Sequence, residues 1–156
     1  EGLFLNHNVF TNLVYPQVAQ KKQKFILPLK ELRQTVNTTI QKISLVPPDP
    51  RKLVSHLSGG NQQKVVIGKW LSLSPRILLL NDPTKGVDIE TRKNLYKIIA
   101  DLSNQGVSVL LYASDNEELI ANCDRVLIVF EGQIVEEICG DRICEENLIA
   151  SSLRVQ

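Results

Sequence analysis

The sequence predicts an α/β protein in which an all-helical stretch comes before the sheet-forming part. Between residues 29 and 74, apolar residues recur at steps of three and four, as on one face of an amphipathic helix. After residue 75, short apolar runs alternate with helical patterns in the order strand, helix, strand, helix, strand, which is typical of an α/β sheet. We therefore expect two domains, a helical one over residues 1–74 and part of an α/β core over residues 75–156.

The helical part contains one well-defined helix before residue 50. Pro47-Pro48-Asp49-Pro50 ends it in a stiff loop, because proline cannot continue a helix. The preceding segment, residues 6–20, mixes apolar and polar residues without a clean period and predicts no element. The predicted buried face of the helix is formed by Leu29, Leu32, Val36, Ile40 and Ile43.

A second helix begins in the sequence Leu57-Ser58-Gly59-Gly60-Asn61 and ends before Ser74-Pro75. A serine and two glycines at a helix start leave backbone N–H groups at the positive end of the helix dipole, which suits a phosphate group. Ser58 is also an ordinary helix cap, and the glycines are also ordinary turn residues, so the residues alone leave both interpretations open. The predicted apolar face of this helix is formed by Val66, Ile67, Trp70 and Leu71.

Polar residues follow the first predicted strand. Ile77–Leu80 is a wholly apolar run, which predicts a strand covered on both faces. Asn81 and Asp82 come directly after it, at the carboxyl end where open α/β sheets bind their ligands. An acidic group there can organise a magnesium ion or a water molecule, so both residues are candidate site residues.

The next helix and strand lead to a second candidate position. Asp88 is expected to cap a helix that Gly106 ends, and residues 107–113 predict the next strand. Ser114 follows that strand, and it lies beside Asp82 if the two strands are neighbours. The buried stripe of the helix is predicted at Leu95, Ile98, Ile99 and Leu102.

Three further elements are expected after residue 114. Residues 115–118 place carboxylates in the first turn of a helix, where the dipole favours negative charge. Two runs, 126–130 and 133–138, flank Glu131-Gly132, which predicts a tight β-hairpin. A last helix is predicted from Glu145 to Leu153.

Composition narrows the class of protein. The chain has 18 basic and 17 acidic residues, a net charge of +1, which argues against a strongly basic nucleic-acid module. Residues 1–56 nevertheless hold eight basic and three acidic residues, and Lys21–Lys24 are either a solvated loop or a contact for a phosphate-rich surface. No apolar stretch approaches the roughly 20 residues of a membrane-spanning helix. Reduced thiols, rather than a metal site, are predicted for Cys123, Cys139 and Cys144.

The segment Leu57–Lys64, followed later by Leu80–Asp88, resembles the nucleotide-binding domain of ABC transporters. The Leu-Ser-Gly-Gly-Asn-Gln-Gln-Lys form of the signature is similar to that in the second, C-terminal ATPase half of bacterial ribose-, galactose- and xylose-type sugar importers. The resemblance covers nearly the whole chain, from Glu1–Phe4 to the Glu131-Gly132 hairpin. It implies the C-terminal part of a P-loop NTPase sheet preceded by a helical subdomain, and an ATPase that uses ATP and Mg²⁺ to drive sugar import.

The resemblance also implies roles for particular residues. In this family, ATP lies between two ATPase units, of which one provides the P-loop and the other the signature. Carried over by position, Ser58, Gly59 and Gly60 would contact the γ-phosphate of ATP held by the partner unit. Asn61 stands where many members have glutamine, and Asp88 ends a turn that reaches across the dimer.

Several positions depart from the family pattern. The chain contains no Gly-x-x-x-x-Gly-Lys-Ser/Thr sequence, so we expect it to lack the P-loop portion and to be a piece of a longer protein. Asn81 occupies the place of a magnesium-directing aspartate and has lost the charge. Asp82 occupies the place of the catalytic glutamate but is one methylene shorter, and a misplacement of about 1 Å can cost ~100-fold in rate. Ser114 replaces a histidine that usually senses the γ-phosphate. This unit's own site is therefore expected to be degenerate, and the isolated chain inactive.

The implied partners are a second ATPase half and the membrane subunits of a permease. The implied location is peripheral, on the cytoplasmic side of the bacterial inner membrane, without nucleic acid. Two other classes remain open: a non-enzymatic assembly module of an ABC complex, and a non-transport ABC ATPase that acts on nucleic acid or ribosomes. The sequence does not identify the sugar, because the resemblance places specificity in other subunits.

Overall fold

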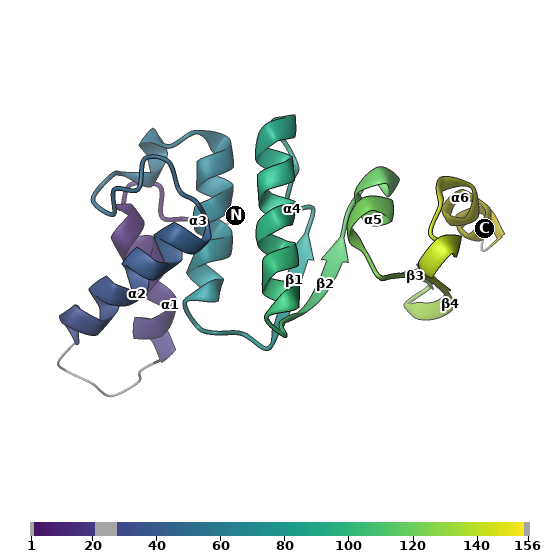
Figure 1. Ribbon diagram of the computed structural model, residues 1–156, viewed down its shortest axis with the longest axis horizontal. Helices are drawn as coiled ribbons and strands as arrows, with labels where there is room; N and C mark the ends of the chain where they lie inside the picture. The colour runs from purple at the N-terminus through teal and green to yellow at the C-terminus, as the bar shows by residue number, and fades with distance from the viewer. Residues whose placement is uncertain (1, 21–27, 155–156) are drawn as a thin grey trace. The chain divides into compact units, whose positions relative to one another are not determined.

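A computed structural model describes residues 2–20 and 28–154 (Figure 1), so the basic cluster Lys21–Lys24 lies outside the described residues. The chain divides into two compact units. The first comprises Glu1–Leu78 and Pro83–Leu110, and the second comprises Leu79–Asp82 and Leu111–Gln156. These bounds differ from the two domains expected from the sequence, and the boundary at residue 74 stays a prediction.

Three helices of the first unit pack around one apolar core: α1 (Val9–Gln20), α2 (Leu29–Lys42) and α3 (Gly59–Leu71). A short 3-10 helix, η1 (Val54–His56), precedes α3. The bounds of α2 and α3 confirm the two helices expected from the sequence. Helix α1 was not expected, because it contains Pro16 and buries a polar residue, Asn12, which disturbs the apolar period. The most deeply buried apolar side chains of this core are Val9, Leu13, Val36, Ile43, Val54, Val65 and Ile67.

The buried face of α3 agrees only in part with the face expected from the sequence, because Ile67 is buried as predicted and Trp70 is not. Trp70 is 47% exposed, whereas Gly68 is buried at the place where α3 meets α1 and α2. A Cβ at Gly68 would lie 2.9 Å from Ile43 Cδ1 and 3.1 Å from Leu13 Cδ2. The close packing at this point is possible because glycine has no side chain. The inner face is therefore centred on the glycine and not on the tryptophan. The predicted buried position of Leu29, at the start of α2, is also wrong, because its side chain is 56% exposed.

Strands β1 (Ile77–Asn81) and β2 (Ser108–Tyr112) pair in a two-stranded sheet and are connected through α4 (Ile89–Asn104). The N–H of Ser108 donates to the carbonyl of Arg76, and the N–H of Asp82 donates to the carbonyl of Tyr112, so the strands run parallel. The expectation that β1 is covered on both faces is wrong for the described chain, since Ile77 and Leu79 are 65% and 71% exposed. Only every second side chain of β1 is shielded from solvent by the described residues. The predicted buried stripe of α4 is confirmed at Leu95, Ile98, Ile99 and Leu102.

The rest of the second unit is a short helix, a hairpin and a final helix. Helix α5 (Asn116–Asn122) precedes the antiparallel strands β3 (Arg125–Phe130) and β4 (Gln133–Cys139), which pair Phe130 with Gln133 across the turn. Glu131 and Gly132 both have positive φ, 47° and 79°, as a type I′ turn requires. After η2 (Gly140–Arg142), helix α6 (Glu145–Arg154) covers the hairpin; their shared core is Val126, Ile138 and Leu148. Among the described helices, none has the length and apolar character needed to cross a membrane.

Candidate functional site

The turn before α3 is held by hydrogen bonds between Ser58 and Asn61. Ser58 is the N-cap; its Oγ accepts from the backbone N–H of Asn61 at 3.4 Å and from Asn61 Nδ2 at 2.9 Å. Asn61 Oδ1 also accepts from the N–H of Val46 at 3.1 Å. The capping interpretation of Ser58 is therefore realised in the structure, and the Asn61 amide is used to brace the turn. The serine hydroxyl keeps its own proton to donate.

The two glycines of this turn have different surroundings. Gly59 is exposed, and among the described residues no atom beyond its two chain neighbours and the nearby backbone of its helix lies within 4 Å of the position a Cβ would take. Gly60 is buried against Thr91, whose Oγ1 would lie 2.7 Å from such a Cβ. An α-helix leaves its first four N–H groups without intrahelical partners, so the start of α3 presents N–H donors at the positive end of a 13-residue helix. This arrangement can hold an anion such as a phosphate.

The Asp88 carboxylate is held by Thr91 at the start of α4. Its Oδ1 accepts from the backbone N–H of Thr91 at 2.8 Å, and its Oδ2 accepts from Thr91 Oγ1 at 2.7 Å. The backbone hydrogen bond, followed by the side-chain one, lowers the pKa of Asp88 below its usual 3.8. The exposed carboxylate is therefore ionised at neutral pH and points in a defined direction.

The strand-end residues Asp82 and Ser114 are in direct contact. Asp82 Oδ1 accepts from the backbone N–H of Ser114, and Asp82 Oδ2 accepts from Ser114 Oγ, both at 2.7 Å. Asp82 has a positive φ of 43°, in the left-handed region that non-glycine residues adopt infrequently. The structure thus brings together two of the positions singled out in the sequence, with Asn81 exposed at the end of β1 beside them.

These residues do not form a dedicated cation site. Mg²⁺ needs a near-octahedral set of oxygen ligands and is usually held by one or two carboxylates. Within residues 2–20 and 28–154, no group of three or more His, Cys, Asp or Glu side chains could hold a metal ion. Both oxygens of Asp82 bind Ser114, and Asn81 offers only a neutral amide oxygen. The observed donor set therefore does not fit Mg²⁺ by itself.

Reduced thiols were predicted for the three cysteines from the sequence. The three cysteines, all in the described part of the chain, are free. Burial, with a smaller effect from the neighbouring Asp124, raises the pKa of Cys123. A raised pKa keeps this thiol protonated, and the protonated form is a poor nucleophile.

Lys69, near the end of α3, is a functional candidate that the sequence did not reveal. Its Nζ donates to the carbonyl of Gly2 and lies 5.1 Å from the ring centre of Phe4 and 5.5 Å from those of Tyr15 and Trp70. Only 5% of the residue is exposed, and burial lowers its pKa. Cation–π attraction to the rings compensates part of the lost hydration. Lys69 thereby ties the N-terminal segment to α3.

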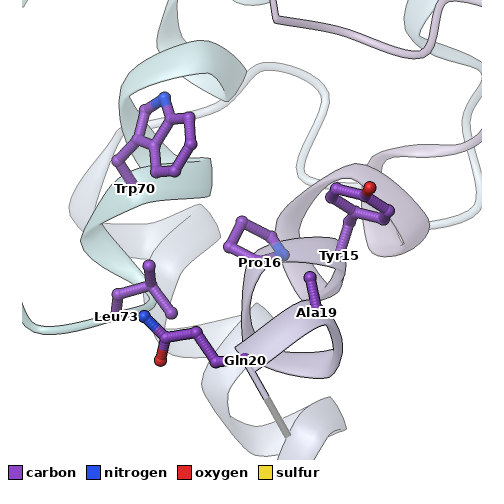
Figure 2. Close-up of a pocket in the computed structure, with 6 residues that line it drawn as sticks. All are labelled: Tyr15, Pro16, Ala19, Gln20, Trp70 and Leu73. Atoms are coloured by element: carbon purple, nitrogen blue, oxygen red, sulfur yellow. The ribbon is translucent and has the colours of Figure 1, made fainter. Parts of the chain in front are cut away.

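A groove opens beside this lysine, between α1 and the end of α3. Figure 2 shows Trp70 and Leu73 on one side and Pro16 and Ala19 on the other. The hollow measures about 230 Å³, and Tyr15 and Gln20 complete its lining. Its walls are mainly apolar, so it can receive an apolar side chain.

A parallel strand pair with its crossover helix, a serine-capped glycine turn and an acidic strand end are features that α/β nucleotide-binding proteins share. The family model described as "ABC transporter" matches residues 1–85, more than half of the sequence. The chain belongs to the ABC transporter family. The ribose import ATP-binding protein RbsA 1 of Mesorhizobium japonicum is 39% identical over 155 residues, which are 99% of this chain and 30% of that protein. The ribose import ATP-binding protein RbsA of Geobacillus kaustophilus is 36% identical over 152 residues, covering 97% of this chain and 31% of the relative.

The chain thus spans about 30% of the length of these curated relatives. Solved structures show the same fold. A crystal structure of the ADP conformation of an ATP-binding cassette of an ABC transporter superposes with a TM-score of 0.81 at 19% identity, covering 96% of this chain and 62% of that one. A dimeric post-hydrolysis state of another cassette, bound to ADP and Pi, gives 0.73 at 21% identity, covering 88% and 58%. The fold is that of an ABC cassette, and this chain covers 62% and 58% of these two solved chains.

Proposed function

We propose that this chain is part of the ATP-binding subunit of an ABC sugar importer, where ATP binding and hydrolysis drive carbohydrate uptake. Its contribution is the signature turn, which completes a composite site around ATP held by a partner ATPase half. Membership of the ABC transporter family supports this proposal, and so do relatives that are named for ribose import. The identity of the sugar is left to other subunits.

The observation that carries the proposal is a contrast between two places in the chain. The signature turn has a capped helix start with N–H groups available to an anion. The strand end lacks an aspartate at Asn81, carries the shorter Asp82 and has Ser114 in place of a histidine. A charge-stabilising turn is therefore present, whereas the groups that would activate water are weakened.

In the proposed mechanism, the hydroxyl of Ser58 and the N–H groups of Gly59 and Gly60 stabilise the negative charge that develops on the transferred phosphoryl group. Asn61 keeps this turn in shape through Ser58 and Val46. Asp88 lies near the water of the same partner site. Catalysis is then mainly a matter of positioning donors around ATP that another unit binds.

The strand-end residues are assigned to this unit's own, slower site. Asp82 takes the position of the catalytic base, and Ser114 takes that of the γ-phosphate sensor. Ser114 donates one hydrogen bond to each oxygen of Asp82, which holds the carboxylate against Ser114 and leaves fewer of its lone pairs for a water molecule. Asn81 takes the magnesium-directing position, and its neutral amide attracts a divalent cation less strongly than an aspartate would. We therefore assign Mg²⁺-ATP binding chiefly to the partner half.

The membrane partner in this proposal is a permease that places a short cytoplasmic helix in the groove between α1 and α3. The apolar walls of the groove support such an occupant. The net charge of +5 over residues 1–56 suits a position near anionic lipid headgroups. The protein would then be peripheral, on the cytoplasmic side of the bacterial inner membrane.

Neither alternative class gains support. A non-enzymatic assembly module would bind a partner ATPase without changing its turnover, and it would have no need of open N–H donors at Gly59. An ABC ATPase that acts on nucleic acid would be expected to carry a basic stripe, whereas the net charge here is +1. The relatives named for ribose import favour transport.

Two substitutions in the assembled transporter test the proposal. Ser58→Arg fills the turn with a bulky cation and removes the cap, so steady-state ATP hydrolysis and sugar uptake should fall by about 10²–10³-fold. Asp82→Asn should reduce both by less than about threefold, because that site already lacks two of its usual groups. The measurements are phosphate release and uptake of labelled sugar by proteoliposomes.

The opposite pattern would overturn the proposal. If Asp82→Asn silences the transporter while Ser58→Arg leaves it working, the chemistry resides in this chain's own site. Ser58→Ala is the matched control, because it removes the cap without adding a charge. It should cost helix stability of about 1 kcal/mol and a smaller part of the activity than arginine does.

A further inference from the structure

We propose that Thr91 is a positioning residue that fixes the signature turn at Gly60 and the Asp88 turn relative to each other. The half-buried threonine sits in the first turn of α4, four residues before the buried stripe begins at Leu95. It touches both turns within the first compact unit. Its importance for ATP hydrolysis rests on the function proposed above, whereas its steric role does not.

The first contact is with the backbone of α3. A Cβ built on Gly60 would overlap Thr91 Cγ2, lie 2.7 Å from Oγ1 and lie 3.1 Å from Cβ. Side-chain atoms do not approach that closely, so any residue larger than glycine must either push α3 and α4 apart or turn Thr91 away from Asp88. Gly59, one residue earlier in the same turn, has open space around its Cβ position in the described structure. The steric demand is therefore specific to Gly60.

The second contact orients Asp88. Both oxygens of its carboxylate accept from Thr91, one from the N–H at 2.8 Å and one from Oγ1 at 2.7 Å. A β-branched side chain has few χ1 choices in a helix. The hydroxyl that binds Asp88 therefore also determines where the methyl group lies, and both groups face Gly60.

One side chain thus links two segments that are 28 residues apart, Gly60 and Asp88. A displacement of the signature turn is passed to Asp88 through Thr91, and the reverse also holds. Both turns are assigned to the same partner-held ATP, so their spacing determines whether their donors can act together. Thr91 affects this spacing without touching the nucleotide.

The test is a double-mutant cycle in the assembled transporter and in the purified protein. Gly60→Ala should lower ATP hydrolysis by about tenfold or more when Thr91 is present, and the same substitution should cost much less in a Thr91→Ala background, from which both Cγ2 and Oγ1 are absent. Gly59→Ala is the matched control: whatever its own cost, that cost should be the same with threonine or alanine at position 91. Thermal unfolding of the same variants should show the same coupling for Gly60 and none for Gly59.

The outcomes separate this inference from the proposed function. If the cost of Gly60→Ala is unchanged by Thr91→Ala in both unfolding and hydrolysis, Thr91 does not position the turn and the inference is wrong. If the unfolding coupling is present but the parent transporter shows no hydrolysis, the inference holds and the proposed function fails. Should Gly60→Ala not fold, recovery of folded protein by Thr91→Ala supports the inference, and lack of recovery overturns it.

A second pair of variants distinguishes positioning from general stability. Thr91→Val keeps a methyl group against Gly60 and loses the hydroxyl that binds Asp88, whereas Thr91→Ser does the reverse. With both proteins folded, at a temperature well below unfolding, Thr91→Val should lower kcat with little change in KM for ATP. Equal kcat values for valine, serine and threonine at position 91 would show a purely structural role.

Discussion

The Asp88 carboxylate receives both of its close hydrogen bonds from one residue, Thr91. The sequence predicted the capping role, because an aspartate before a helical period is a strong start signal. It did not predict that the same threonine would press on Gly60, since those residues are distant in sequence. At the scale of single residues, local rules thus identified the cap and missed the packing partner.

Low pH should weaken the stabilisation that the Asp88 cap gives to α4, and one substitution at Asp88 separates this effect from other effects of acid. The folded-state pKa of Asp88 lies below its usual 3.8, so its stabilisation is present above pH 3.8 and is lost as pH falls through the folded-state pKa. An asparagine at this position would still accept the hydrogen bond from the backbone, but its amide does not titrate. The unfolding midpoint of the parent should therefore fall more steeply below pH 3.8 than that of Asp88→Asn, measured by thermal melts across this range. Parallel curves for the two proteins would contradict the assigned cap.

At the scale of elements, the helices with capped ends were the most predictable. Ser58 and Asp88 both cap where the sequence indicated, and α3 and α4 begin as expected. The buried faces were less predictable, because glycine contributes nothing to an apolar period and yet allows the closest approach of helices. Gly68 therefore centres the inner face of α3, and Trp70 is left beside the groove.

The groove between α1 and α3 makes an element-scale prediction about the permease. A benzophenone amino acid placed at Ala19, which is exposed in the groove, should crosslink to a permease subunit when the transporter is illuminated. The same probe at Lys93, exposed on α4 outside the groove, is the control and should give little crosslink. Mass spectrometry of the products identifies the partner. Crosslinking at Lys93 and none at Ala19 would mean that the permease sits elsewhere.

At the scale of the whole molecule, the order of strands and helices from residue 75 onward followed from the sequence, because each apolar run was bounded by turn residues. The contact of Asp82 with Ser114, 32 residues later, was expected only on the condition that β1 and β2 pair. The tie from Lys69 to Gly2, 67 residues apart, was not expected at all. Contacts between residues so far apart in the sequence depend on how the helices pack, and local sequence patterns do not predict that packing.

The chain by itself should not bind ATP measurably. A P-loop supplies most of the backbone N–H groups that hold phosphates, and the sequence contains no P-loop motif. The signature turn adds donors to a nucleotide already held and does not replace those groups. Titration calorimetry of the folded 156-residue chain with Mg-ATP should show no saturable heat, with a complete cassette as the positive control. Micromolar affinity would refute this assignment of roles.

Because Lys69 is buried, the rate at which an amine reagent labels it reports on the packing of α1 against α3. Amine reagents modify exposed lysines such as Lys30 and Lys97 directly, whereas the ammonium of Lys69 is screened by three aromatic rings and only 5% of the residue is exposed. Its modification has to await a local opening that separates Phe4, Tyr15 and Trp70. The labelling rate of Lys69 relative to that of the exposed lysines then reports how often this local opening occurs. A partner bound in the neighbouring groove would make the opening less frequent and would lower the labelling rate of Lys69.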